Sequence, residues 1–460
     1  MTDDIIVLVP SGMAVCFCRW RNLLICLCTP CILLVLLFVY ITLLVCLTTP
    51  LTSGTTSILN IDHFIAPGTH RNEGWAPSPD RFWEPHLSLG VWNLLQLSTD
   101  RSINPILRPY KHSRLPDRGA NGSRDPRPAG DPPGSRDPVP QLDRLAGDIL
   151  EFARHMHKRD YPVVAEPQDA CGAGSANDHG RALLLLAIKT KVQNFKNRQI
   201  IRSTWGQAGW VAGQRLAGGG YVRRVFLLGT DRSRDNSTAW PDLVTLEGRQ
   251  YKDILQWDFH DSFFNLTLKD VLFWRWFSRG CRQTHFVFKG DDDVFVNTPA
   301  LVDYLSQQLG DPGTAMKSFM VGDVIGAAQP SRNNKSKYFV PEAFYAGSYP
   351  PYAGGGGVVY SGLLTKLLHL VSKRVHLYPI DDVFVGMCLL KLNAYPSHHP
   401  AFLTFDFPGD EEMKPCAYHK TIMVHKRMPD RVEQLWARLK ESQPLCWNVT
   451  LREDKLKNKP

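Results

Sequence analysis

The spacing of apolar residues divides the chain into parts of different character. Residues 22–47 contain no charged side chain, and this run exceeds the roughly 20 apolar residues that span a bilayer. Residues 48–144 show little sustained periodicity, and 101–140 are dense in Pro, Gly, Arg, Asp and Ser. Such a segment cannot bury enough apolar surface to fold alone, so we expect a disordered stem. From residue 145 onward apolar strands alternate with amphipathic helices, which predicts an α/β domain with a mainly parallel sheet.

Charges beside the apolar run predict the topology. Arg19 and Arg21 lie just before it, and positive residues favour the cytosolic side. We therefore expect a cytosolic tail at 1–21, a transmembrane signal anchor at 22–47, a stem at 48–144 and a lumenal domain at 145–460. A cleaved signal peptide is the alternative, but the run is longer and farther from the N-terminus than is typical of one.

Three strand and helix units are predicted early in the lumenal domain. The expected strands are Leu183 to Ile188, Val222 to Leu228 and His285 to Phe288; the expected helices are Asn197 to Trp205 and Leu266 to Phe277. Arg198 and Arg202 are four residues apart and share a helix face. This order favours a doubly wound, Rossmann-like, nucleotide-binding half. The later part, with Phe319 to Val324 and the loop Tyr349 to Gly357, would form the acceptor half.

Composition narrows the classes of function. Lys and Arg exceed Asp and Glu by 53 to 44, but the excess is spread along the chain, which argues against a nucleic-acid partner. Five of the 11 cysteines follow the apolar run. None of these five forms a C-x-x-C pair, so structural disulfides are expected and a zinc site is not. Sequons for N-glycosylation occur at Asn121, Asn236, Asn265, Asn334 and Asn448.

An acidic triplet is the first candidate for chemistry. Asp291, Asp292 and Asp293 follow the third predicted strand and precede the apolar run Val294 to Val296. Ligands of open α/β sheets sit at the carboxyl ends of strands. A hard divalent cation, Mn²⁺ or Mg²⁺, could bridge these carboxylates and a diphosphate there. A solvated acidic turn is the alternative for a bare D-x-D pattern.

A second acidic pair and a glycine-rich loop complete the candidates. Asp381 and Asp382 begin a predicted helix; they could be ordinary caps, or one could be a general base for an acceptor hydroxyl. Tyr349 to Gly357 contains two tyrosines suited to stacking on a sugar and four glycines that permit close backbone approach; a merely flexible loop is the alternative. His425 lies in an apolar run, where a structural role is more usual than metal ligation.

These motifs together resemble one known family. They are Arg198-x-x-Ile201-Arg202-x-Thr204-Trp205-Gly206, Phe226-Leu227-Leu228-Gly229, Asp258-Phe259-x-Asp261-x-Phe263-x-Asn265-Leu266-Thr267-Leu268-Lys269, Phe288-Lys289-Gly290-Asp291-Asp292-Asp293-Val294-Phe295, Tyr349-Pro350-Pro351-Tyr352 and Asp382-Val383-x-Val385-Gly386. In this order and spacing they are similar to the β1,3-glycosyltransferases, and in detail to the β1,3-N-acetylglucosaminyltransferase branch more than to the β1,3-galactosyltransferases.

The resemblance implies a fold and roles. It implies a GT-A type, inverting, metal-dependent transferase that uses a UDP-sugar. Asp291 and Asp293 would hold the metal, and His425 would be its third ligand. Asp382 would be the base, with Asp381 a close second. The remaining implied contacts are to the nucleotide or donor sugar: Arg198, Arg202, Trp205, Asp292, Gly355, Gly356 and Gly357. The resemblance and the oxidising lumen also suggest disulfides between Cys388 and Cys416 and between Cys171 and Cys281, with Cys446 unpaired.

Three functions stay open at this point. The leading one is transfer of N-acetylglucosamine from UDP-GlcNAc to a galactose-terminated acceptor, carried by a glycoprotein or glycolipid, in the Golgi lumen. The alternatives are a β1,3-galactosyltransferase that uses UDP-galactose and a lumenal glycan-binding pseudoenzyme. A pseudoenzyme would be expected to have lost an acidic ligand or the base, and all are present. The resemblance leaves open whether the chain forms oligomers with itself or with other glycosyltransferases.

Overall fold

The computed structural model describes residue 37 and residues 90–103, 142–167, 170–171, 182–215, 218–231, 240–281, 283–310 and 319–453. The chain divides into two units, Met1–Asn60 and Ile61–Pro460, and every element below belongs to the second. The predicted anchor at 22–47 lies outside the described residues apart from Leu37. Among the helices that are described, none combines the length and the apolar character needed to cross a bilayer.

The second unit is built on a nine-stranded sheet in the order β1-β5-β4-β2-β6-β11-β8-β12, with β3 paired to β4. Its strands are β1 (Val163–Ala165), β2 (Leu184–Lys189), β3 (Gly209–Ala212), β4 (Gly219–Thr230), β5 (Ile254–His260), β6 (Phe286–Asp291), β8 (Met320–Gly322), β11 (Gly357–Ser361) and β12 (Ser397–His398). Strands β5, β4, β2 and β6 run parallel. Their carboxyl ends therefore meet at one edge of the sheet.

Two small sheets accompany the large one. One pairs β9 (Val324–Ile325) with β10 (Tyr352–Ala353). The other has the order β13-β14-β7 and consists of β13 (Phe402–Leu403), β14 (Met423–His425) and β7 (Val294–Val296). The second small sheet brings the chain near residue 425 beside the strand that follows the acidic triplet.

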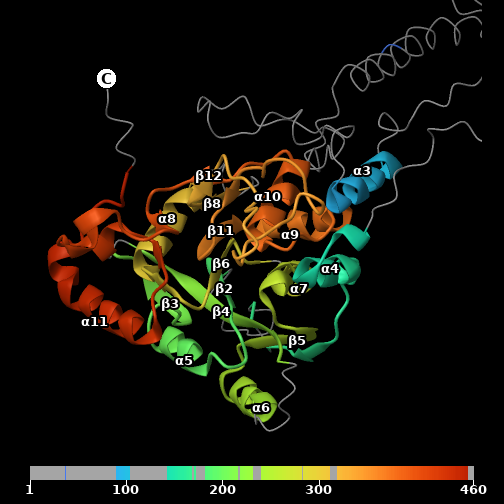
Figure 1. Ribbon diagram of the computed structural model, residues 1–460. Coiled ribbons are helices and arrows are strands. Elements are labelled where there is room, and N and C mark those ends of the chain that lie inside the picture. The colour runs from blue at the N-terminus through green and yellow to red at the C-terminus, as the bar shows by residue number, and fades with distance from the viewer. Residues whose placement is uncertain are drawn as a thin grey trace, which may run out of the picture. The chain divides into compact units, whose positions relative to one another are not determined.

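Helices cover both faces of the central strands (Figure 1). The α-helices are α3 (Val91–Ile103), α4 (Gly147–His155), α5 (Phe195–Ser203), α6 (Trp240–Tyr251), α7 (Leu266–Gly280), α8 (Thr298–Gly310), α9 (Gly362–Val371), α10 (Asp381–Lys391) and α11 (Pro429–Cys446). Short 3-10 helices are η3 (Leu142–Arg144), η4 (Phe263–Asn265), η5 (Ser372–Arg374), η6 (Gly409–Met413) and η7 (Ala417–Lys420). Helix α7 packs against α9 and α10, and α5 packs against α11.

The fully buried strand β2 explains this arrangement. Leu184, Leu186 and Ile188 alternate along the strand and so share one face of the sheet. They belong to the core cluster that also contains Ile201 of α5 and Trp436 of α11. All six residues of β2 are buried, as expected for a central parallel strand with helices on both faces. The three predicted strands and two predicted helices are confirmed within a few residues.

The sheet differs from the expectation of mainly parallel pairing because it is mixed. Strand β11 runs antiparallel to both neighbours, β6 and β8, and β1 runs antiparallel to β5. A glycine-rich turn at Gly355 and Gly356 leads from β10 into β11, which then runs antiparallel beside β6. Strand β5 and helix α6 were not among the predicted elements.

Part of the expected stem belongs to the folded unit. Helix α3 lies within residues 48–144, and the Val91 and Trp92 amides donate to the carbonyls of Ala343 and Phe344 at 2.9 and 2.8 Å. The Trp92 side chain is only 2% exposed. Apolar residues recur at helical spacing from Val91 to Leu97, a local pattern that the bulk composition of the stem conceals.

The disulfides correct one expected pairing. Cys171 and Cys281 are bonded, with their Cα atoms 5.0 Å apart, as predicted. Cys416 is bonded to Cys446, with Cα atoms 5.5 Å apart, so the predicted Cys388–Cys416 bond and free Cys446 are wrong. Cys388 is buried and unbonded in α10, where burial raises the pKa of its thiol. Helix α11 returns its C-terminal end to η7, which sequence spacing did not reveal.

Candidate active site

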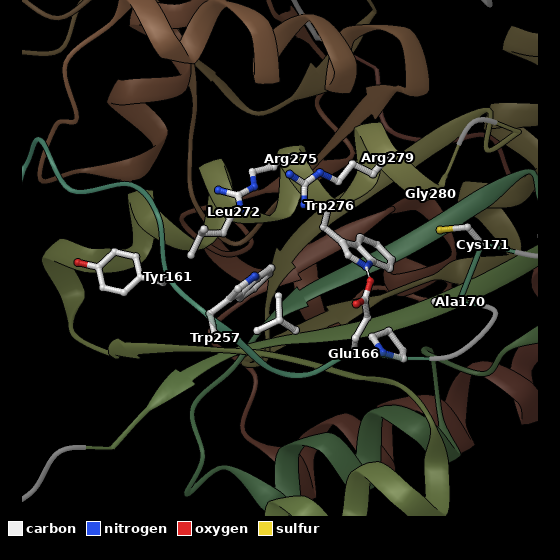
Figure 2. Close-up of a pocket in the computed structure, with 12 residues that line it drawn as sticks. Tyr161, Glu166, Ala170, Cys171, Trp257, Leu272, Arg275, Trp276, Arg279 and Gly280 are labelled. Atoms are coloured by element: carbon white, nitrogen blue, oxygen red, sulfur yellow. Dashed lines mark hydrogen bonds between the residues drawn. The ribbon is translucent and has the colours of Figure 1, made fainter.

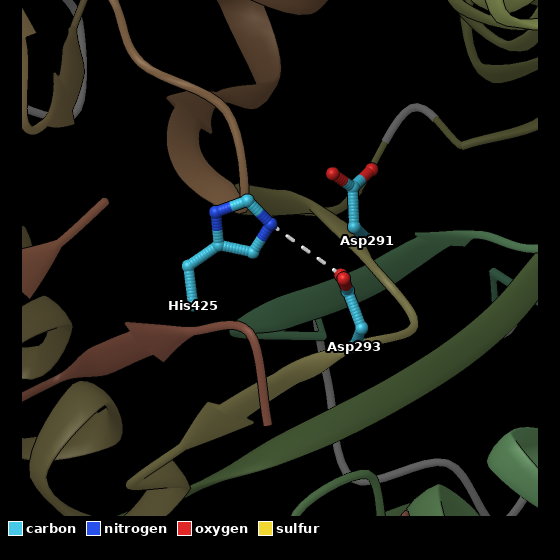
Figure 3. A group of neighbouring side chains, drawn as sticks. All are labelled: Asp291, Asp293 and His425. Carbon is cyan, nitrogen blue, oxygen red and sulfur yellow. Dashed lines mark ion pairs between the residues drawn. The ribbon is translucent and has the colours of Figure 1, made fainter. Parts of the chain in front are cut away.

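Two carboxylates and an imidazole converge at the carboxyl edge of the sheet. Asp291 ends β6, Asp293 is the last residue of the turn before β7, and His425 ends β14. Because β14 pairs with β7, His425 lies opposite Val294. One ligand atom from each of Asp291, Asp293 and His425 lies within 4.8 Å of the others, and Figure 3 shows the three side chains around one space. The structure thus brings His425 to the two aspartates, from which it is far removed in sequence.

The donor chemistry of these three residues fits a hard divalent cation. Oxygen and imidazole ligands suit Mn²⁺ and Mg²⁺. His425 Nε2 lies 3.5 Å from Asp293 Oδ1, while its Nδ1 lies 3.3 Å from the Thr404 carbonyl oxygen, which orients the ring as in many metal sites. Burial acts against the charged imidazole, but the Asp293 carboxylate prevails and raises the His425 pKa.

Asp292, the middle residue of the triplet, has hydrogen-bond partners other than the metal-site residues. The Asp292 carboxylate accepts hydrogen bonds from the Thr190 hydroxyl and, at 2.8 Å, from Asn194 Nδ2. Burial raises its pKa to about 6, against the effect of these donors. Asp292 therefore joins the triplet to the loop before α5. The expected contact of this residue with the nucleotide stays a prediction.

Two buried lysines lie beneath the acidic groups. Lys189, at the end of β2, places Nζ 2.6 Å from Asp381 Oδ2 and 3.0 Å from Asp291 Oδ1. Lys289 places Nζ 2.7 Å from Asp270 Oδ2 and 3.4 Å from Asp381 Oδ2. Burial of an unpaired ammonium would be costly, so these pairs hold the carboxylates in fixed positions. Sequence reasoning missed both lysines, although each ends or interrupts an otherwise apolar strand.

The two aspartates of the second acidic pair have opposite electrostatic environments. Burial acts to raise the pKa of Asp381, but Lys189 and Lys289 outweigh it and lower that pKa. For Asp382, burial and the neighbouring Asp381 carboxylate raise the pKa to about 7. Its nearest lysine nitrogen, Lys289 Nζ, is 3.9 Å from Asp382 Oδ1. Asp381 is thus a fixed anion, and Asp382 can gain and lose a proton near neutral pH.

The expected helix cap is not formed by either aspartate. Helix α10 begins at Asp381, its N-cap is Ile380, and no side chain caps it. The Asp381 carboxylate instead points to the lysines, because an ion pair with a buried ammonium outweighs a single cap hydrogen bond. Both carboxylates still lie in the first helical turn, where the helix dipole favours negative charge.

The glycine-rich loop approaches the acidic groups closely. A Cβ atom on Gly355 would lie 2.9 Å from Asp382 Oδ2. One on Gly356 would lie 3.0 Å from the His425 ring, and Gly356 also has a φ of +100°. Glycine is therefore required for this approach. The structure places Gly355 beside Asp382 and Gly356 beside His425. The predicted donor-sugar contacts of Gly355, Gly356 and Gly357 stay predictions.

Arg198, Arg202 and Trp205 all occupy buried positions. Arg198 is 0% exposed and binds Glu247 through Nε at 2.9 Å and Nη2 at 2.7 Å. Arg202 binds Glu247 and also Asp253. Trp205 packs edge-on against Phe288. The guanidinium groups of Arg198 and Arg202 are thus paired with carboxylates, whereas Trp205 Nε1 has no hydrogen-bond partner. The expected contacts of these three residues with the nucleotide stay predictions.

A positioning role explains these arginines better. Arg198 Nη2 donates to the Val192 carbonyl at 3.1 Å, and Nη1 donates to the Lys191 carbonyl. The loop that they hold includes Thr190 and Asn194, the two partners of Asp292. Sequence alone could not separate a direct nucleotide contact from this supporting role.

The two tyrosines of the loop also differ in accessibility. Tyr349 is 3% exposed, and its hydroxyl accepts a hydrogen bond from Tyr378 at 3.1 Å. Its ring packs against Tyr345 and Tyr378, so it is not available for sugar stacking as expected. Tyr352 is half-buried and close enough to Asp382 for that carboxylate to help raise its pKa, although burial is the larger cause.

A separate cavity of about 290 Å³ lies by the C-terminal half of α7. Figure 2 shows Trp257 and Glu166 on one side and Arg275, Trp276 and Arg279 on the other. The Trp276 Nε1 donates to Glu166 at 2.8 Å. None of the acidic groups described above lines this cavity, so it is distinct from the candidate active site.

Comparisons with known proteins identify the class. A family model described as Galactosyltransferase matches residues 196–400. Human N-acetyllactosaminide beta-1,3-N-acetylglucosaminyltransferase 2 is 42% identical over 67% of this chain and 74% of that protein. Its mouse counterpart is 37% identical over 80% of this chain and 89% of that protein. Human UDP-GlcNAc:betaGal beta-1,3-N-acetylglucosaminyltransferase 9 is 39% identical over 70% of this chain and 80% of that protein.

These findings define a glycosyltransferase whose α/β domain is consistent with the GT-A type. The chain belongs to the β1,3-glycosyltransferase family, as its motifs indicated, and its similar relatives bear the names of β1,3-N-acetylglucosaminyltransferases. The matched segment contains the acidic triplet, the glycine-rich loop and the second acidic pair.

Proposed function

We propose that this protein transfers N-acetylglucosamine from UDP-GlcNAc to the 3-hydroxyl of a terminal galactose, with inversion at the anomeric carbon. The names of its relatives supply the sugar and the linkage. The observation that carries the chemistry is Asp382, a carboxyl group with its pKa raised to about 7, beside the Asp291, Asp293 and His425 group.

In the proposed reaction Asp382 accepts the proton of the acceptor hydroxyl. The hydroxyl oxygen forms a bond to the anomeric carbon while the bond from that carbon to the UDP oxygen breaks, and UDP leaves with the electron pair. A divalent cation, held by Asp291, Asp293 and His425, would balance the charge of the diphosphate. Lys189 bridges Asp291 and Asp381, so it fixes the distance between the diphosphate side and the base side of the site.

A panel of donors and acceptors tests this proposal. The purified lumenal region is incubated with UDP-GlcNAc, UDP-galactose or UDP-GalNAc, and with β-galactosides or β-N-acetylglucosaminides as acceptors. We expect transfer from UDP-GlcNAc to β-galactosides, with a β1,3 linkage by NMR. The description of the matched family model favours galactosyl transfer as the second candidate. Transfer of galactose in preference to N-acetylglucosamine would establish that candidate and reject ours.

Chelation tests the metal. We expect EDTA to abolish transfer and added Mn²⁺ to restore it, because Asp291 and Asp293 would otherwise face the diphosphate with like charge. Binding of Mn²⁺ is measured directly by electron paramagnetic resonance, with and without UDP. Full turnover after exhaustive chelation, or no bound Mn²⁺ in the presence of UDP, would remove the cation from the mechanism.

We further infer the setting of this reaction from the segments that the sequence predicts. A tail at 1–21, an anchor at 22–47, a stem within 48–144 and a catalytic domain at 145–460 would place the site in the Golgi lumen. Helix α3 shortens that stem, since its residues pack onto the catalytic domain. The acceptor would then be a glycan of a membrane or secretory glycoprotein or glycolipid.

A further inference from the structure

Phe405 is a large apolar side chain left in solvent at the rim of the active site. It is 75% exposed. A single exposed apolar residue is ordinary by itself, so exposure alone assigns nothing. The position of Phe405 distinguishes it. The preceding residue, Thr404, is 8% exposed and contacts both Gly355 and His425.

Thr404 connects Phe405 to the proposed base and to the metal ligands. The Thr404 hydroxyl donates to the Gly355 carbonyl at 3.2 Å, and its carbonyl oxygen lies 3.3 Å from His425 Nδ1. Gly355 in turn borders Asp382, whose Oδ2 would be 2.9 Å from a Cβ atom there. Gly355 therefore lies between Thr404 and Asp382, and Phe405 is the residue directly after Thr404.

The residue after Phe405 holds it rigidly in place. Asp406 adopts a φ of 85°, a conformation that non-glycine residues rarely occupy. Its carboxylate is fixed by Arg427, whose Nη1 lies 3.1 Å from Asp406 Oδ2 and whose Nη2 lies 2.5 Å from Oδ1. The Arg427 amide donates to the Asp293 carbonyl at 2.7 Å. The turn is therefore locked to the strands that carry the metal ligands.

These contacts point to the acceptor as the ligand. A hydroxyl that reaches Asp382 belongs to a sugar ring, and the rest of the acceptor must extend from Asp382 over the rim of the site. β-Galactosides carry a contiguous patch of C–H groups on one face, which packs favourably on an aromatic ring. Asp323 Oδ2 accepts from the Thr404 amide at 3.3 Å and adds a carboxylate beside the same turn.

We propose that Phe405 is the aromatic platform on which the acceptor β-galactoside stacks. This inference rests on the proposed function for the class of the acceptor. It predicts that Phe405 sets acceptor affinity and specificity and has no part in binding the donor.

The test compares Phe405→Ala, Phe405→Tyr and the control Leu445→Ala, which truncates a side chain that is 87% exposed on α11. Since Phe405 is exposed, all variants should unfold at the wild-type temperature. Loss of a buried aromatic contact predicts an increase of at least about tenfold in the acceptor KM of Phe405→Ala. The donor KM should not change, and Phe405→Tyr should lie within about twofold of the wild type because it keeps the flat ring.

Direct binding separates this inference from the proposed function. Saturation-transfer NMR with a β-galactoside, in the presence of UDP and Mn²⁺, reports acceptor contact without turnover. If the wild type binds the galactoside but transfers nothing, the proposed function is rejected. The platform is then still tested by the expected loss of the NMR signal in Phe405→Ala. Three results would each overturn the platform. The first is an acceptor KM or NMR signal of Phe405→Ala equal to that of Leu445→Ala. The others are a rise in the donor KM of Phe405→Ala as large as the rise in its acceptor KM, and no galactoside binding by the wild type.

Discussion

Asp382→Asn is expected to lower kcat about 100- to 10,000-fold, as is typical when a general base is lost. UDP binding by calorimetry should be nearly unchanged, because the carboxylate acts on the acceptor rather than on the nucleotide. In the wild type, the pKa of about 7 predicts that activity rises with pH until Asp382 is ionised near pH 7 and then levels off. The variant should lose this dependence.

The neighbouring variant Asp381→Asn is the matched control. Asp381 pairs with both Lys189 and Lys289, so its neutralisation removes one partner from a buried ion-pair network and should cost roughly 3 kcal/mol of stability. Asp382→Asn should instead leave stability equal or greater at pH 8, since a carboxyl with a raised pKa opposes folding when it is ionised. Thermal unfolding and kcat are measured on both. If Asp381→Asn is folded and inactive while Asp382→Asn turns over normally, the assignment is reversed; if both turn over normally, the base lies elsewhere.

Asp293→Asn is expected to abolish detectable transfer while the protein remains folded. The change removes one negative charge from the proposed metal site and keeps the size of the side chain. The Asp293 side chain is 41% exposed, so we expect only a small loss of stability. Mn²⁺ binding, followed by electron paramagnetic resonance, should weaken together with activity.

Asp430→Asn provides the comparison for Asp293. Asp430 is paired with Lys196 on the surface and is 72% exposed, and such pairs contribute little to stability. It should behave as the wild type in folding, Mn²⁺ binding and turnover. Wild-type activity in folded Asp293→Asn would show that Asp293 does not bind an essential cation.

The sequence alone identified the family and the local elements. Strand β2 and helices α5 and α7 follow from the spacing of neighbouring apolar residues, which is set by short-range periodicity. Asp291, Asp293 and Asp382 could be named because each lies in a compact motif. Charge and local pattern sufficed there, since the residue types and their immediate neighbours carry the information.

Only the tertiary structure decided how those residues are supported and which of them meet. Lys189 and Lys289 come from separate strands, and their convergence on Asp381 gives a physical difference between that residue and Asp382, for which the sequence offered only the family resemblance. Arg198 proved to be buried against Glu247, 49 positions away, and Cys416 bonds to Cys446 because α11 folds back on η7. Long-range pairing depends on the packing of whole elements, and local sequence does not encode it residue by residue.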